Sequence, residues 1–160
     1  MKGSPFEALA KVPVLILAAG HGGKDSGACS GPYREADEAI VLVELMAGLL
    51  RPVLGDAAVV IAPHAQDTHE TIPWINARYK FGEAWAIEIH RDSADTIKEP
   101  DASLRCGIYH GSSQVSVAIA AHVLTGMKAR GAHGSSWTRD HHECRLTRWA
   151  GSIKSAASPH

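Results

Sequence analysis

Apolar runs alternate with helical periods along the chain as far as residue 130. Four runs are short and largely apolar, which is typical of strands: 12–19, 57–62, 85–90 and 104–110. Three segments repeat apolar residues at helical spacing: 35–50, which is followed by Pro52, 71–81 and 113–127. Strands that alternate with helices predict an α/β fold, with a mostly parallel, twisted central sheet and helices on both of its faces.

The remaining segments lack a regular pattern. Residues 20–31 are rich in glycine and small polar residues and predict a loop, and residues 93–103 predict a second, polar loop. From residue 130 to the end, glycine, histidine, tryptophan and basic residues mix without a clear period. The chain shows neither internal repeats nor a low-complexity linker, so we expect residues 1–160 to form a single domain.

Composition narrows the class of protein. Hydrophobic residues make up 45% and charged residues 21% of the 160 residues, as in ordinary globular proteins. The formal net charge is -1, whereas a nucleic-acid-binding domain normally carries a basic excess, so we expect no nucleic-acid partner. The three cysteines, Cys29, Cys106 and Cys144, lie far apart, which argues against a disulfide scaffold or a cysteine-based zinc site.

The apolar run at residues 12–19 is the longest in the chain and is too short to cross a bilayer. It reads poorly as a secretion signal, because it lacks a basic lead and continues directly into the segment around His21. We therefore expect a protein that is made in the cytoplasm without an export signal of its own and does not insert into a membrane.

Two histidines and one glutamate stand at the edges of the predicted elements. His21 follows the first strand in a glycine-rich turn, Glu35 begins the first helix, and His90 ends the third strand. Each of them alone has an ordinary structural explanation, such as a turn histidine or a glutamate favoured by the helix dipole. In parallel sheets, however, ligands gather at the carboxyl ends of strands, and two imidazoles with one carboxylate can hold a zinc ion while leaving a fourth position for water.

The order and context of these residues are similar to those of a known family. The segment Gly20 to Ala28 matches the motif Gly-His-Gly-Gly-x-Asp-x-Gly-Ala, Glu35 follows His21 by 14 residues, and His90 follows Glu35 by 55 residues. A later segment, 106–113, resembles the family's next strand and serine-rich turn. On these residues the chain resembles the zinc-dependent N-acetylmuramoyl-L-alanine amidases of amidase type 3, over roughly residues 12–131.

The resemblance implies an enzyme that uses Zn²⁺, held by His21, Glu35 and His90. Such an enzyme hydrolyses the amide between the lactyl group of N-acetylmuramic acid and L-alanine, so the implied partner is peptidoglycan. A compact chain without an export signal or wall-binding repeats would fit a phage or prophage endolysin that acts on the cell wall as a monomer.

The sequence departs from the family pattern at three places. An aspartate often found three residues before the first ligand is Ala18 here, so a partner of the ligands is lost or supplied elsewhere. The second histidine is followed by Arg91 and an aspartate in place of the commoner Ala-Asn. The terminal apolar strand that carries the family's presumed proton-shuttling glutamate is not recognisable; Glu143 is the best substitute by residue type, and Asp140 is a further candidate.

Substrate contacts are predicted by residue type alone. Arg91 could face the acidic groups of the stem peptide, and Trp137 and Trp149 could stack on sugars, although tryptophans more often pack in a core.

Two other functions stay open at this stage. A degenerate amidase could keep affinity for zinc or cell wall without efficient turnover, which the missing glutamate motivates. A zinc peptidase or deacetylase on a different α/β fold could use the same three ligands.

Overall fold

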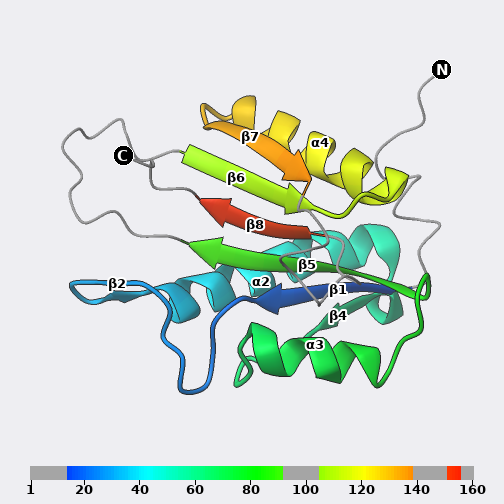
Figure 1. Ribbon diagram of the computed structural model, residues 1–160, viewed down its shortest axis with the longest axis horizontal. Helices are drawn as coiled ribbons and strands as arrows, with labels where there is room; N and C mark the ends of the chain where they lie inside the picture. The colour runs from blue at the N-terminus through cyan, green and yellow to red at the C-terminus, as the bar shows by residue number, and fades with distance from the viewer. Residues whose placement is uncertain (1–13, 92–104, 139–150, 156–160) are drawn as a thin grey trace.

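The computed structural model describes residues 14–91, 105–138 and 151–155. Within these residues, six strands form one sheet in the order β4-β1-β5-β8-β6-β7 (Figure 1). The strands are β1 Val14–Ala19, β4 Val59–Ile61, β5 Ala84–Arg91, β6 Arg105–His110, β7 His133–Thr138 and β8 Gly151–Ser155. The helices are α2 Glu35–Leu54, α3 Thr68–Asn76 and α4 Gln114–Lys128, with a short 3-10 turn, η1, at Asp56–Ala58. Two-residue strands, β2 Cys29–Ser30 and β3 Tyr33–Arg34, pair in the loop before α2.

Most neighbouring strands of the sheet run parallel. β4, β1, β5 and β8 are parallel neighbours, and β6 is parallel to β7. Among the described residues, the one antiparallel pairing within this six-stranded sheet is therefore between β8 and β6. This confirms the predicted α/β fold with a mostly parallel sheet.

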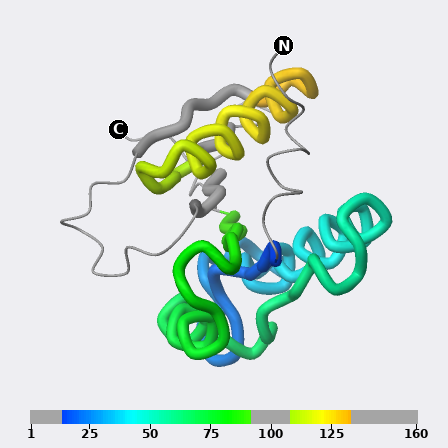
Figure 2. Tube along the Cα trace, turned by 90° about the vertical axis from the view of Figure 1, so that its right-hand side faces the viewer, coloured from blue at the N-terminus to red at the C-terminus, as the bar shows by residue number. Residues whose placement is uncertain are grey.

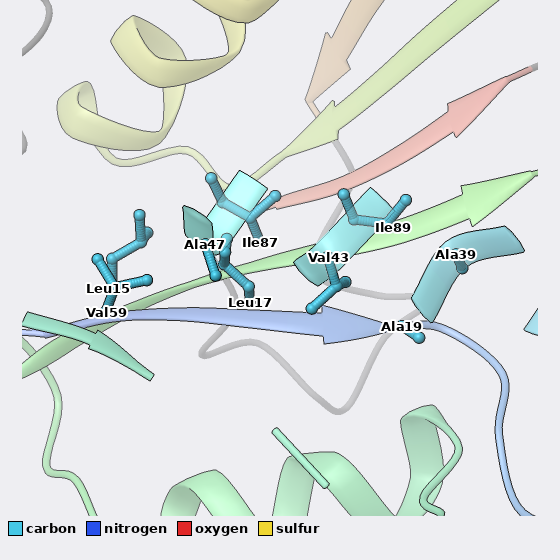
Figure 3. Close-up of a cluster of buried hydrophobic side chains, with 9 residues drawn as sticks. All are labelled: Leu15, Leu17, Ala19, Ala39, Val43, Ala47, Val59, Ile87 and Ile89. Carbon is cyan, nitrogen blue, oxygen red and sulfur yellow. The ribbon is translucent and has the colours of Figure 1, made fainter. Parts of the chain in front are cut away.

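The two faces of β1 bury different residues, because successive side chains of a strand point to opposite faces. Leu15 and Leu17 pack with Val43 of α2 in one cluster, whose side chains are labelled in Figure 3. Ile16 and Ala18 face the other side, where α3 packs. Helices therefore lie on both faces of the sheet, with α2 and α3 on opposite sides of β1 (Figure 2).

The two helices that frame the site differ from their predicted bounds. α2 does not end before Pro52 but continues to Leu54. The helix tolerates this proline in its last turn because only one intrahelical hydrogen bond is lost and the fixed φ of proline is compatible with a helix. Gly55, with φ 92, then closes the helix by donating its N–H to the carbonyl of Arg51 at 2.8 Å. α3 begins at Thr68, earlier than predicted, because Asp67 and Glu70 form a capping box at its start.

Strands β7 and β8 were not predicted. Both lie in the segment without a clear period, and β8 takes a place between β5 and β6. Its sequence is Gly-Ser-Ile-Lys-Ser and includes no glutamate. Among the described residues, no helix is long and apolar enough to cross a membrane.

Candidate metal centre

His21, Glu35 and His90 meet at the carboxyl edge of the sheet. β1 and β5 are adjacent and parallel, so their ends bring His21 and His90 to one place. Glu35, the first residue of α2, lies between them: its Oε1 is 3.4 Å from His21 Nε2 and 3.1 Å from His90 Nδ1. One ligand atom from each of the three residues lies within 4.8 Å of the others. The structure thus brings together the three residues that the sequence singled out.

The Glu35 carboxylate is buried and held by backbone groups. The N–H of Ala28 donates to Oε2 at 2.9 Å, and the N–H of Arg91 donates to Oε1 at 2.9 Å. These bonds come from the loop after β1 and from the last residue of β5. They fix the carboxylate at the start of α2, where the helix dipole also favours a negative charge.

Glycine at two positions makes the close approach possible. A Cβ built on Gly20 would lie 2.1 Å from Cε1 of the His90 ring. A Cβ on Gly27 would lie 2.7 Å from Cδ2 of His21, and the φ of Gly27, 63°, is in the left-handed region. Both rings therefore occupy space that a larger residue would take.

The outer nitrogen of the His21 ring faces Asp25. Nδ1 of His21 lies 2.8 Å from Asp25 Oδ2, and the N–H of Gly27 donates to Asp25 Oδ1 at 2.9 Å. The hydrogen bond from Gly27, followed by that from His21, lowers the pKa of the Asp25 carboxyl below its usual value. Asp25 is therefore an ionised acceptor that directs Nε2 of His21 toward Glu35.

The outer nitrogen of the His90 ring faces Glu88. Nε2 of His90 lies 3.2 Å from Glu88 Oε1, which also accepts a hydrogen bond from the hydroxyl of Thr68. Burial opposes ionisation of Glu88, but the hydrogen bonds from His90 and Thr68 outweigh it and lower the pKa of this carboxyl. Both histidines thus have a carboxylate on the side away from Glu35.

The donor set fits a zinc ion. Ligands about 2.0–2.1 Å from a tetrahedral zinc lie about 3.3 Å from one another, close to the separations between Glu35 and the two histidines. Zinc-binding histidines typically direct their second ring nitrogen to a carboxylate or carbonyl, as both do here. Among the described residues, these three ligands would leave a fourth position open, as in catalytic rather than structural zinc sites.

The other predicted site residues are placed less closely. The Arg91 side chain is exposed and pairs with Glu38 at 2.5 Å, while its backbone N–H serves Glu35. Trp137 belongs to β7 at the far edge of the sheet, and Glu143 lies outside the described residues.

Sequence reasoning missed the outer partners of the ligands. Asp25 stands in the quoted motif but received no role, although its spacing of four residues from His21 was visible. Glu88 stands two residues before His90 in an apolar strand, so both side chains share one face, and a charged residue there was a usable signal. Thr68 gave no signal, because its approach depends on how α3 packs.

Comparison with known proteins shows similarity of fold. No family model matches the chain, and no curated protein matches it. Among solved structures, the N-acetylmuramoyl-L-alanine amidase AmiC2 of Nostoc punctiforme shares 20% identity at a TM-score of 0.60, over 89% of this chain and 77% of that one. An N-acetylmuramoyl-L-alanine amidase from Clostridium difficile 630 shares 16% identity at a TM-score of 0.62, over 90% and 78%. The catalytic domain of the amidase CwlV from Bacillus (Paenibacillus) polymyxa shares 22% identity at a TM-score of 0.55, over 89% and 78%. The chain therefore has the fold of solved N-acetylmuramoyl-L-alanine amidases.

Proposed function

We propose that this chain is a zinc-dependent amidase that hydrolyses the bond between N-acetylmuramic acid and L-alanine in peptidoglycan. The observation that carries the proposal is the convergence of His21, Glu35 and His90, each supported from behind by backbone groups or a carboxylate. The fold shared with solved amidases of this activity supports the choice of substrate.

Each of the three residues would offer one atom to the metal. His21 would offer Nε2, His90 would offer Nδ1 and Glu35 would offer a carboxylate oxygen. When bound, zinc supplies an acidified water and polarises the substrate carbonyl. With Zn²⁺ held by two neutral imidazoles and the one negative charge of Glu35, the site would keep a net positive charge. That charge would stabilise the oxyanion that develops on the substrate carbonyl.

Proton transfer to the leaving nitrogen requires a further acid. Asp25, Glu35 and Glu88 each contact an imidazole and are engaged in holding the ligands. We therefore keep Glu143, with Asp140 as second candidate, as the proposed proton-transfer residue. Arg91 and Trp137 stay predictions as contacts of the stem peptide and glycan.

The biological setting follows from the activity and stays a prediction. An enzyme of this kind would act on the cell wall, and we propose a phage or prophage endolysin that works as a monomer.

Release of dye from labelled peptidoglycan, together with zinc content, tests the function. We expect the parent protein to bind one zinc per chain and to release dye, and His21→Ala, Glu35→Ala and His90→Ala to lose both. Glu143→Ala should keep zinc and lose most of the activity. Glu44→Gln is the control, since Glu44 is an exposed glutamate that pairs with His64 outside the site.

The products distinguish the alternatives. An amidase frees the whole stem peptide with an L-alanine amino terminus and leaves the glycan intact. A degenerate binding module would retain zinc and cell wall but release no dye, and a peptidase or deacetylase would release different fragments. Either result would overturn the proposed activity.

A further inference from the structure

A buried glutamate lies beside the position where the sequence lacks an expected aspartate. Ala18 of β1 and Glu88 of β5 are register partners in the parallel sheet, so they occupy the same row. Both lie on the face that packs against α3, because Ala18 and Ala86 belong to one buried cluster there and Glu88 follows Ala86 by two residues. The carboxylate missing from β1 is thus present on the neighbouring strand.

The surroundings of Glu88 direct its carboxylate toward His90. Oε1 of Glu88 accepts from the Thr68 hydroxyl and lies 3.2 Å from His90 Nε2. Thr68 is itself fixed, because its hydroxyl lies 2.8 Å and its N–H 3.2 Å from the carbonyl of Gly20. A buried carboxylate is costly unless it is hydrogen-bonded, and these contacts meet that requirement.

We propose that Glu88 replaces the aspartate expected at position 18 as the positioning residue of the metal centre, fixing the ring of His90 with its proton on Nε2. Both ring nitrogens of His90 face a carboxylate, Nδ1 that of Glu35 at 3.1 Å and Nε2 that of Glu88 at 3.2 Å. A nitrogen that binds a metal offers its lone pair, so with Nδ1 as the ligand the ring proton is on Nε2, where Glu88 accepts it. Glu88 lies on the side of the ring away from Glu35 and therefore acts through His90 rather than on the substrate. This inference rests on the proposed metal centre and adds the residue that orients one of its ligands.

The relation between positions 18 and 88 gives a test by exchange. Glu88→Gln keeps the shape but offers an amide that can donate as well as accept. Glu88→Ala removes the acceptor, and the double variant Glu88→Ala with Ala18→Asp returns a carboxylate to the same row from the neighbouring strand. Glu44→Gln is the matched control. Glu44 lies away from the metal centre, and its carboxylate is 2.9 Å from the ring nitrogen of His64.

Two measurements do not depend on turnover. Competition with a chromogenic chelator gives the zinc dissociation constant, and ¹⁵N NMR of the histidine rings in the metal-free protein gives the tautomer of His90. We expect Glu88→Gln and Glu88→Ala to raise the dissociation constant about 10- to 100-fold, the usual effect of losing a partner behind a zinc-binding histidine. In the metal-free protein Glu35 also accepts from the ring, so the fraction of His90 with a proton on Nε2 should be higher in the parent than in these variants. Adding Ala18→Asp to Glu88→Ala should restore both the zinc affinity and that fraction.

The outcomes separate this inference from the proposed function. If the parent binds no zinc, the proposed centre is wrong. If the parent binds zinc and Glu88→Gln or Glu88→Ala leaves both affinity and tautomer unchanged, only the role of Glu88 is wrong. If affinity falls but the double variant, shown by circular dichroism to be folded, does not recover, the replacement of position 18 by Glu88 is overturned.

Discussion

The two histidines of the candidate centre are supported in different ways. His21 lies in a loop, with a side chain 24% exposed, and its partner Asp25 is 48% exposed. His90 lies in a central strand, with a side chain 10% exposed, and its partner Glu88 is 7% exposed. The same chemical arrangement, a carboxylate behind each imidazole, is therefore built once at the surface and once in the interior.

The supports of His21 and His90 differ in how many secondary-structure elements and loops they combine. The support of His21 is local, since Asp25 and Gly27 follow it within one turn of the chain. The support of His90 combines β5 and α3 with the bend after β1 at Gly20. Water can replace a lost carboxylate on the exposed side but not on the buried side, so we expect variants on the two sides to differ in size of effect.

Glu35→Gln should have the largest effect, because Glu35 contacts both histidines. Partners behind zinc ligands are worth about 10- to 100-fold in affinity, so loss of a charged ligand between them should exceed 100-fold. Chelator competition measures this, with Glu44→Gln as control. Zinc affinity within a few-fold of the parent would show that the two sides do not share Glu35.

Gly20→Ala should damage the buried side alone. The new Cβ would meet the His90 ring at 2.1 Å, so the ring must move away from Glu35. We expect zinc affinity to fall at least about 10-fold and the free energy of unfolding to fall by about 1–3 kcal/mol, as in overpacked sites. Chelator competition and urea unfolding give the two values.

Gly48→Ala is the matched control for this glycine. Gly48 lies within α2, and a Cβ there would meet nothing within 4 Å. Alanine should raise the free energy of unfolding by about 0.5–1 kcal/mol and leave zinc affinity unchanged. Equal zinc affinities for Gly20→Ala and Gly48→Ala would contradict the crowding at His90.

The sequence predicted the elements that form the site because their patterns are strong. β1 and β5 are apolar runs next to one another in the sheet, and their observed bounds lie within two residues of the predicted ones. β7 and β8 were missed because glycine and serine have weak strand preference, so their pairing with β6 comes from the rest of the sheet.

The ligands could be predicted more readily than their supports. His21 and His90 stand at strand ends and Glu35 at a helix start, positions that a linear pattern reveals. That Glu88 lies beside Ala18 follows only from the register of β1 on β5, which the sequence does not state. From the residues alone, the prediction was only that the partner expected at position 18 is lost or supplied elsewhere.

Asp25→Asn should weaken zinc binding less than Glu88→Gln does. Asp25 is about half exposed, so an asparagine oxygen or a water can accept the proton of His21 Nδ1 in its place. We expect a loss of less than about 10-fold, below the usual range of about 10- to 100-fold for such partners. An Asp25 variant weaker than the Glu88 variant would reverse the comparison and make the loop the dominant support.

Acid should remove the contributions of both carboxylates, and this is the smallest expected effect. The folded pKa values of Asp25 and Glu88 lie below their usual values of 3.8 and 4.5. Groups with lowered pKa stabilise the folded state fully above the unfolded value, and this contribution is lost as the pH falls through the folded value. In the zinc-free protein, the difference in free energy of unfolding between the parent and the double variant Asp25→Asn with Glu88→Gln should therefore be constant above about pH 6 and shrink below about pH 4.

Single variants assign this acid loss to the two sides. Urea unfolding across the pH range should show this shrinkage for Glu88→Gln and for Asp25→Asn separately, because the pKa of each carboxyl is lowered in the folded state. A difference that grows as the pH falls would mean that the carboxylates are protonated in the folded state. The acceptor role assigned to both of them, and with it the tautomers of His21 and His90, would then be wrong, because a protonated carboxyl can donate its own proton to the ring.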